Sequence, residues 1–360
     1  MFAIGRRNRK RATSLDVARE AGVSQATVSV VLNGSATAIR ISDDTRARVM
    51  AAADALGYVP NHAAQSLRRR RTRSITFISP APENPYFAEV VAGAQAAAQE
   101  AGYSVFIAAV PTAQAARQIL WHLNAGTSDG VIFGSRDPSV GGELRHAMRR
   151  GLVGVALQYA PWDDQQLVPV VRTDKHAGGY LATRHLIQLG HRRIAHLVDA
   201  AHYAHLPAER TAGYRRALAE AGIEFQPDWQ VEGTNSVAGG DACMRLLLQR
   251  PGPQPTAVFV FNDQMAIGAL HALRKLGLRV PEDMAVIGFD GIGLGAFTNP
   301  ELTSVEQPRA EVGRRAVELI FDLLAGKYTT SREVTLPLRL VIRESCGASK
   351  GLEGGMEHAR

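Results

Sequence analysis

Short apolar runs recur along the chain after residue 74, and stretches with the spacing of amphipathic helices separate them. Alternation of this kind is typical of parallel sheets covered by helices. A segment of this size has more such runs than one sheet usually holds. We therefore expect an α/β sensor made of two doubly wound parallel sheets, one in each of two lobes. The runs occupy residues 75–79, 104–109, 130–134, 154–157, 193–198, 257–261 and 285–289, and helices are expected at 87–101 and 175–189.

The positive charge of the chain is concentrated at its amino-terminal end. Residues 1–73 hold 14 Lys and Arg against 5 Asp and Glu, whereas residues 74–360 hold 27 against 29. The formal net charge of +7 therefore comes from the first fifth of the chain. A basic segment on a near-neutral body indicates binding to a polyanion, and the alternative is a merely solubilising tail.

The rest of the composition argues against several classes of protein. The two cysteines, Cys243 and Cys346, stand far apart and outside any CxxC motif, so neither a disulfide framework nor a zinc site is expected. No apolar run reaches the length of a membrane span, and the basic start lacks the apolar core of a signal peptide. No catalytic or phosphate-loop motif is present. We expect a cytoplasmic protein that is not an enzyme and holds no metal and no cofactor.

Residues 13–59 have the pattern of an all-α helix-turn-helix head. Thr13 and Asp16 have the spacing of a capping box, so a helix should begin there. A turn at Gly22 leads to a second helix that begins at Ser24. Two short helices joined by a tight glycine turn form a helix-turn-helix. A third helix is expected to begin near residue 42.

The second helix is expected to read DNA bases. Val28, Val31 and Leu32 fall on one face and should pack inward, which leaves the opposite face for DNA. Gln25 is the best candidate for direct reading because its amide can bond adenine at two points. Ser24, Thr27 and Ser29 are better suited to phosphate contacts or caps. The expected DNA contacts of the head are Thr13, Ser24, Gln25, Ala26, Thr27, Ser29, Val30 and Asn33.

The head closely resembles that of the lactose/galactose repressor (LacI/GalR) family in the strings SLDVAREAGVSQATVSVVLNG and TRARVMAAADALGYVPNHAAQSL. The resemblance continues through NPYFAEVVAGAQAAAQEAGY, ERTAGYRRAL, FNDQMAIGAL, RVPEDMAVIGFD and LTSVEQP, and so covers about residues 13–346. It implies a hinge helix after the head and a sensor that resembles periplasmic sugar-binding proteins. It also implies a homodimer on a near-palindromic double-stranded DNA operator, with a small effector between the lobes, most often a sugar or a sugar derivative.

Residues 60–73 resemble the hinge helix and linker of this family. The helical part is too short to be stable alone, so we expect it to form only when two copies meet on DNA. The resemblance implies that Leu67 wedges between base pairs in the minor groove, which kinks the duplex. Asn61, Ala64 and Arg68 are expected beside it at the DNA. The alternative is a plain flexible linker.

The candidate effector residues follow predicted strands or match ligand positions of the family. Tyr86 and Phe87 offer an aromatic wall at a helix start, while the resemblance implies that Arg210 and Asp263 bind the effector. Their alternatives are a solvated helix start and a helix cap, respectively. Asp290 ranks lower because it has the position of a structural carboxylate at a strand end. The full set is Tyr86, Phe87, Ser135, Gln158, Arg210, Asn235, Asp263 and Asp290.

Several positions depart from the family pattern. Val30 stands where many members carry Arg, and the segment 33–45 is longer than usual, so the operator sequence stays open. Gln158 stands where many sugar-binding members carry Asp. Ala204 and Leu206 stand where the purine-binding member carries polar residues, and Asn235 replaces an aromatic residue that is common nearby. These changes argue against a purine effector and weaken the case for an ordinary sugar.

Five segments are expected along the chain. A disordered basic tail (1–12) precedes the head (13–59), and the hinge and linker (60–73) lead to the sensor (74–346) and a disordered tail (347–360). We expect one lobe at 74–172 with 306–330 and the other at 173–303 with 331–346.

The function most consistent with these patterns is a ligand-responsive transcriptional repressor. One alternative is a solute-binding protein of a transporter, which the basic head and the lack of a signal peptide disfavour. Another is a sugar-processing enzyme, which the lack of a catalytic cluster disfavours.

Overall fold

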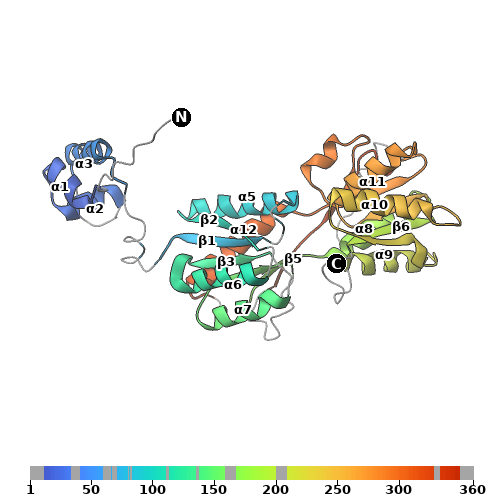
Figure 1. The fold of residues 1–360 in the computed structure, drawn as a ribbon, viewed down its shortest axis with the longest axis horizontal. Coiled ribbons are helices and arrows are strands. Elements are labelled where there is room, and N and C mark those ends of the chain that lie inside the picture. The colour runs from blue at the N-terminus through green and yellow to red at the C-terminus, as the bar shows by residue number, and fades with distance from the viewer. Residues whose placement is uncertain are drawn as a thin grey trace, which may run out of the picture. The chain divides into compact units, whose positions relative to one another are not determined.

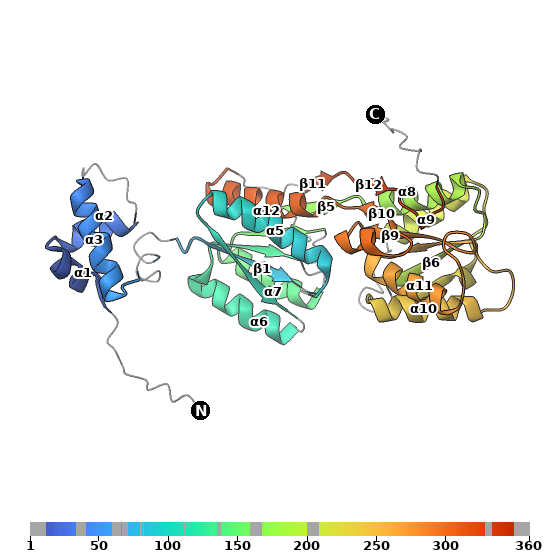
Figure 2. The ribbon, with the colours of Figure 1, turned by 90° about the horizontal axis from the view of Figure 1, so that it is seen from above.

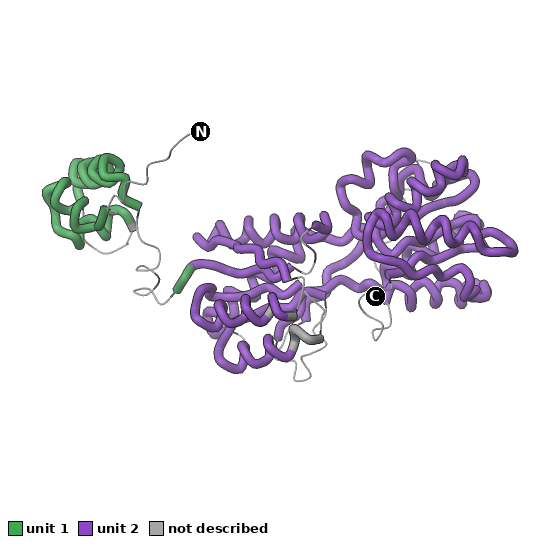
Figure 3. The backbone as a smooth tube through the Cα atoms, viewed as in Figure 1, with its two compact units in different colours: residues 1–72 green, residues 73–360 purple. Residues whose placement is uncertain are grey.

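The chain divides into two compact units, residues 1–72 and 73–360 (Figure 3). The computed structural model describes residues 12–33, 41–59, 66, 71–79, 81, 83–110, 113–134, 138–158, 168–199, 209–327 and 333–348.

Three helices make up the described part of the first unit: α1 (Ser14–Ala21), α2 (Gln25–Asn33) and α3 (Asp43–Leu56). The expected capping box is present, since Thr13 Oγ1 accepts from Asp16 N and Thr13 N donates to Asp16 Oδ2 at 2.9 Å. Gly22, at φ 63°, ends α1 in the left-handed conformation that glycine adopts at low cost. A small apolar core holds the three helices together. The predicted helix-turn-helix is confirmed.

The first lobe of the second unit is built on a sheet of strand order β11-β5-β4-β3-β1-β2, in which every neighbouring pair is parallel. Helices α5 and α12 pack together on one face, and α6 and α7 cover the other (Figures 1 and 2). The strands are β1 (Ser74–Ser79), β2 (Ser104–Ala109), β3 (Gly130–Phe133), β4 (Gly154–Leu157), β5 (Val170–Thr173) and β11 (Glu333–Leu336). The helices are α5 (Pro85–Glu100), α6 (Ala113–His122), the π-helical turn η1 (Leu123–Thr127), α7 (Pro138–Arg149) and α12 (Arg309–Leu324).

The second lobe repeats this plan with the strand order β12-β10-β9-β8-β6-β7, in which only the β10–β12 pair is antiparallel. Helices α8 and α9 lie on one face and α10 and α11 on the other (Figure 1). The strands are β6 (Ile194–Asp199), β7 (Gln230–Gly233), β8 (Ala257–Val260), β9 (Ala285–Asp290), β10 (Thr303–Glu306) and β12 (Arg339–Val341). The helices are α8 (Lys175–Gln188), α9 (Glu209–Glu220), η2 (Pro227–Trp229), α10 (Val237–Gln249), α11 (Asp263–Lys275) and η3 (Gly293–Phe297).

The carboxy-terminal lobe boundary differs from the sequence prediction. The prediction places all of 331–346 in the second lobe, but β11 pairs with β5 in the first sheet and only β12 joins the second. The chain therefore passes between the lobes three times, after β5, after β10 and between β11 and β12. The strand β11 escaped prediction because it is an edge strand whose side chains alternate between exposed and half-buried, so it has no continuous apolar run.

Candidate functional site

The described part of α2 has the two faces that the sequence predicts. Val28 and Val31 are buried in the core of the head, whereas Gln25 and Ala26 are exposed. The amide of Gln25 is oriented by α1, because Gln25 Nε2 donates to Ser14 Oγ at 2.8 Å. A base-reading side chain that is held in place loses less conformational entropy on binding.

Two of the expected DNA contacts also hold the head together. Thr13 caps α1, and Ser24 Oγ accepts from Thr27 N at 3.1 Å at the start of α2. Ser29 and Val30 are half-buried. Asn33 is the last residue of α2. The hinge residues Asn61, Ala64, Leu67 and Arg68, the Asn33 side chain and the effector candidate Ser135 lie outside what the structure describes.

A chain of hydrogen bonds, some buried and some partly buried, lies where the strands of the first sheet end. Asn84 caps α5 and accepts from Tyr86 N at 2.9 Å, which positions the Tyr86 ring. Gln158, which follows β4 with φ 69°, donates from Nε2 to Tyr86 Oη at 2.7 Å. Thr173 N donates to Gln158 Oε1 at 3.2 Å. Burial, reinforced by the charge of Asp290, raises the pKa of Tyr86, which keeps its hydroxyl neutral. The ring of Phe87 packs edge-on against Tyr86, so the predicted aromatic pair is present.

The hydrogen-bond chain continues into the second lobe. Thr173 Oγ1 donates to Gln307 Oε1 at 2.6 Å, and Gln307 Nε2 donates to Asp290 Oδ1 at 2.7 Å. Asp290 ends β9 with φ 108°, a backbone region that non-glycine residues seldom adopt. Residues from the ends of four strands, β4, β5, β9 and β10, thus meet at one polar cluster. We call it the crossover cluster and define it as Tyr86, Gln158, Thr173, Gln307, Asp290 and Arg210.

Arg210 is the cationic member of the crossover cluster. Its guanidinium lies over the rings of Phe261 and Phe289, at 4.3 and 3.9 Å from their centroids, and Nη1 donates to Phe261 O at 2.7 Å. Nη2 lies 3.5 Å from Asp290 Oδ1. The close contact of α8 and α9 sets this position, because a side chain at Gly179 would collide with the Arg210 backbone. Stacked and paired guanidiniums of this kind offer directional donors to a ligand.

The structure gives Asp263, for which the resemblance implies an effector contact, a set of structural bonds. Asp263 is 0% exposed, and its carboxylate accepts from Ser304 Oγ at 2.6 Å and from Ile292 N at 2.8 Å. These bonds hold the loop after β9, so Asp263 is a structural carboxylate. Asp290, which the sequence analysis ranks lower, is the carboxylate that pairs with Arg210.

Residue Asn262, which precedes Asp263, makes a hydrogen bond to another candidate effector residue. It caps α11 and donates from Nδ2 to Asn235 Oδ1 at 2.6 Å, which connects it to the exposed effector candidate Asn235. Sequence reasoning missed it because either residue of the pair could cap the helix.

Four further residues of this region were also missed. Thr173 and Gln307 carry the hydrogen-bond chain, while Lys175 and Arg309 are buried cations beside Asp290. Recognition of the strand at 303–306 would have placed Gln307 and Arg309 at a strand end. Thr173 is the last residue of β5 and Lys175 follows it, and this strand is too weakly apolar to stand out in the sequence.

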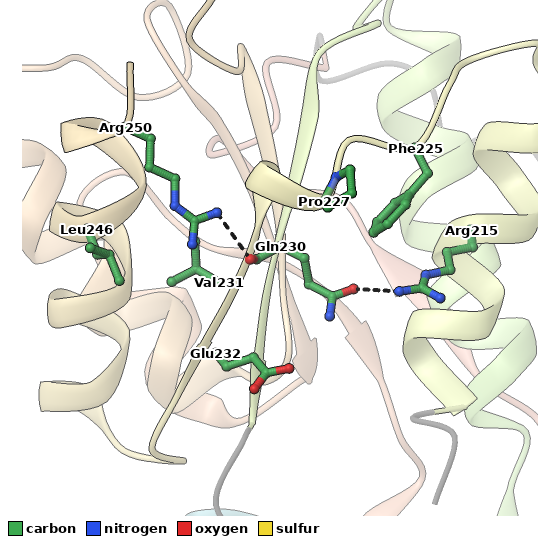
Figure 4. A pocket seen from close by; sticks show the side chains of 8 residues that line it. All are labelled: Arg215, Phe225, Pro227, Gln230, Val231, Glu232, Leu246 and Arg250. Atoms are coloured by element: carbon green, nitrogen blue, oxygen red, sulfur yellow. Dashed lines mark hydrogen bonds between the residues drawn. The ribbon is translucent and has the colours of Figure 1, made fainter. Parts of the chain in front are cut away.

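A separate pocket of about 440 Å³ lies at the outer edge of the second sheet (Figure 4). Arg215 Nη2 donates to Gln230 Oε1 at 3.2 Å, and Arg250 Nη1 donates to Gln230 O at 3.3 Å. Its walls are Arg215, Phe225, Pro227, Gln230, Val231, Glu232, Leu246 and Arg250. None of the predicted effector residues is among them, so this pocket is distinct from the crossover cluster.

Comparison with known proteins identifies the family. Residues 13–61 match the family described as bacterial regulatory proteins, lacI family, and residues 183–346 match the periplasmic binding protein-like domain. The chain is 35% identical over 335 residues to the ribose operon repressor of Haemophilus influenzae, covering 93% of this chain and 98% of that protein. This protein belongs to the LacI family. It is 34% identical over 336 residues to the HTH-type transcriptional repressor PurR of Mannheimia succiniciproducens, with the same coverage of both chains.

Solved structures of LacI-family members have the same fold. The lac repressor dimer bound to operator and the anti-inducer ONPF matches with a TM-score of 0.79 and 29% identity, covering 94% of this chain and 100% of that one. The CelR–cellobiose complex matches with a TM-score of 0.69 and 33% identity, covering 93% and 100%. This LacI-family protein is therefore a ligand-responsive DNA-binding transcriptional regulator. Within the described ranges, no helix is long and apolar enough to cross a membrane, and no group of three His, Cys, Asp or Glu could hold a metal.

Proposed function

We propose that this protein represses a carbohydrate operon and that a small effector bound at the crossover cluster changes its affinity for the operator. The observation that carries the proposal is the hydrogen-bond chain from Tyr86 through Thr173 and Gln307 to Asp290. This chain connects the ends of strands in both sheets. An effector that contacts Asp290 or Arg210 therefore acts on the contacts that join the two lobes.

The residue types of the crossover cluster favour a hydroxyl-rich effector over a purine. Two amides, two hydroxyls, a carboxylate and a stacked Arg offer directional donors and acceptors to sugar hydroxyls. CelR was solved with cellobiose, and a LacI-family regulator from Enterococcus faecium was solved with ribose. A purine, which the name PurR suggests, would be better served by an aromatic side chain than by Asn235, which is exposed. We assign contact roles to Tyr86, Phe87, Gln158, Arg210, Asn235, Asn262 and Asp290.

The protein would act as a homodimer in the cytoplasm, where the operator is. Two heads on a near-palindromic site require two-fold symmetry. A face for the second subunit is offered by the edge strand β2, where Phe106 and Ile107 are 61% and 57% exposed, and by Trp121 of α6, which is 68% exposed. Large apolar side chains exposed on a parallel sheet usually mark an interface. Asn61, Ala64, Leu67 and Arg68 would then meet their counterparts at the operator centre.

The regulators of this family are not enzymes, and we propose the same for this chain. The effector would be released without chemical change. Binding it would alter DNA affinity through a coupling free energy of about 1–3 kcal/mol, and DNA would alter effector affinity by the same factor.

An operator selection followed by a ligand screen tests this proposal. The full chain would be used to select operators from random double-stranded DNA, and sugars and purines would be screened by their effect on its melting temperature. Any hit would then be titrated into the operator complex. We expect a near-palindromic operator and a sugar-type ligand that shifts operator affinity at least about fivefold. Failure to enrich any sequence, or a ligand that leaves operator affinity unchanged, would refute the proposal.

A further inference from the structure

The pocket at the outer edge of the second sheet, which we call the edge pocket, holds two arginines that contact the same residue. Arg215, on α9, donates from Nη2 to the side-chain oxygen of Gln230 at 3.2 Å. Arg250, which follows α10, donates from Nη1 to the backbone oxygen of Gln230 at 3.3 Å. Gln230 begins the edge strand β7, and Figure 4 shows the two guanidiniums on opposite sides of it. Positive charges from α9 and from the end of α10 therefore line one pocket.

Both guanidiniums are held in place by contacts that leave several of their donors for a ligand. The guanidinium carbon of Arg215 lies 4.3 Å from the centroid of the Phe225 ring, and Arg250 Nη1 also contacts Asp228 O. A guanidinium has five N–H donors, and these contacts use one nitrogen of each Arg. Among the described residues, neither Arg pairs with a carboxylate. An Arg that is already stacked or fixed loses less conformational freedom when it binds an anion.

The other walls of the edge pocket are mostly apolar. Phe225, Pro227, Val231 and Leu246 line it, and Leu246 is 48% exposed. The volume of about 440 Å³ is typical of sites that bind small organic molecules. The edge pocket therefore combines donors for an anionic group with a surface for an apolar one.

One carboxylate limits the charge that the edge pocket accepts. Glu232 is the acidic residue among the eight that line it, beside the two arginines. It is exposed, and within the described part of the chain it forms no ion pair. Its charge repels a second anionic group on a ligand. A phosphate monoester carries close to two negative charges at neutral pH, whereas a carboxylate carries one. Two arginines and one Glu thus favour a ligand with a single carboxylate.

We propose that the edge pocket binds a small organic acid with one carboxylate and an aromatic or branched apolar group. Arg215 and Arg250 receive the carboxylate through charge-assisted hydrogen bonds. The apolar group packs against Pro227 and Leu246. The edge pocket shares no residue with the crossover cluster, so it is a second ligand site, and its existence does not depend on the effector or on the repressor function.

Two simple acids test this proposal without knowledge of the natural ligand. Isothermal titration calorimetry of the full chain would measure the affinities of hydrocinnamate, of isocaproate and of their neutral amides, with acetate as the carboxylate without an apolar group. We expect at least one of the two acids to bind saturably. Its amide and acetate should bind at least about tenfold more weakly, equivalent to about 1.4 kcal/mol.

Substitutions show where the acid binds, which is necessary because the basic head also attracts anions. Arg215→Gln removes donors from an exposed position of the edge pocket and should weaken the affinity at least about tenfold. Leu246→Ser removes apolar surface from another exposed position and should weaken it at least about threefold. Glu232→Gln should strengthen the binding of phenylsuccinate, whose second carboxylate Glu232 repels. Phenylsuccinate affinity that is unchanged in this variant would contradict the requirement for a single charge.

Matched controls remove an Arg from the same two helices outside the edge pocket. Arg216→Gln on α9 breaks the pair with Glu220, and Arg245→Gln on α10 breaks the pair with Asp241. Both variants should keep the wild-type affinity for the acid.

Arg250→Gln should weaken the affinity as Arg215→Gln does. Since Arg250 also holds the backbone at Asp228 and Gln230, this variant is the one most prone to misfold, and Arg215→Gln and Leu246→Ser then decide the result. Three outcomes would overturn the proposal: no saturable binding of either acid, equal affinities of an acid and its amide, or wild-type affinity in both Arg215→Gln and Leu246→Ser.

Discussion

Thr173 and Gln307 meet at 2.6 Å, Oγ1 to Oε1, although 134 positions separate them in the sequence. A threonine hydroxyl has one hydrogen to donate. Since Gln307 Nε2 must donate to Asp290, Gln307 Oε1 has to be the acceptor for Thr173. The donor Thr173 Oγ1 and the acceptor Asp290 Oδ1 therefore together determine which way the amide of Gln307 faces.

Replacing Thr173 by Val should destabilise the sensor. The substitution keeps the volume but leaves Gln307 Oε1 buried without a donor, which should lower the free energy of unfolding by about 1–3 kcal/mol. Urea unfolding of the full chain measures this loss. Thr173→Ser keeps the hydroxyl and should lose less, while Thr335→Val, at an exposed position on β11, should change little. Equal losses for the Val and Ser variants would assign the effect to packing.

Replacing Gln25 by Ala should impair operator recognition selectively. Loss of a bidentate base contact should cost about 1–3 kcal/mol on the selected operator and little on random DNA. Fluorescence anisotropy at fixed salt measures both affinities, with Gln99→Ala, exposed on α5, as the control. Equal losses on both DNAs would remove Gln25 as a base reader.

The burial of Asp263 predicts a pH dependence of stability. Its pKa is raised by burial from 3.8 to about 7, so the folded state holds a proton that the unfolded state has released between these values. Stability should therefore fall as the pH rises from about 4 to about 7. Comparison of unfolding curves across this range should show a flatter profile for Asp263→Asn, which stays neutral. An unchanged slope in that variant would show that another group titrates.

Replacing Leu67 by Ala should weaken operator binding and reduce DNA bending while effector binding stays intact. An apolar wedge between base steps supports the kink, and Ala is too short to provide it. Bending can be followed by energy transfer between dyes at the two ends of the operator. Bending equal to that of the wild-type protein would show that Leu67 is not the wedge.

The sequence was sufficient for the parts of the fold that carry strong local signals. The capping box of Thr13 and the apolar runs of the central strands place the head and both sheets correctly. Edge strands such as β11 carry weaker signals, because only one side of each pairs with a neighbour and their side chains stay partly exposed. The lobe boundary was wrong for this reason.

The effector residues were harder to predict than the strands that present them. In the pair Asn262–Asp263, either residue could cap α11. The role of Asp263 depends on its bonds to Ser304 and Ile292, which lie later in the chain. Likewise, Thr173 gains its role only through Gln307. Partners at such separations leave no local pattern, so residue type alone cannot reveal them.

The three passages of the chain between the lobes also constrain biosynthesis. When a ribosome has made residues 1–300, five strands of the first sheet exist, but α12 and β11 are still missing. The apolar face that α12 covers, which includes Val155 and Val171, then stays open to water. The first strands of the first lobe are synthesised early in translation, but the lobe is complete only near the end of translation. Nascent chains of this protein should therefore need shielding from aggregation for almost the whole of their synthesis.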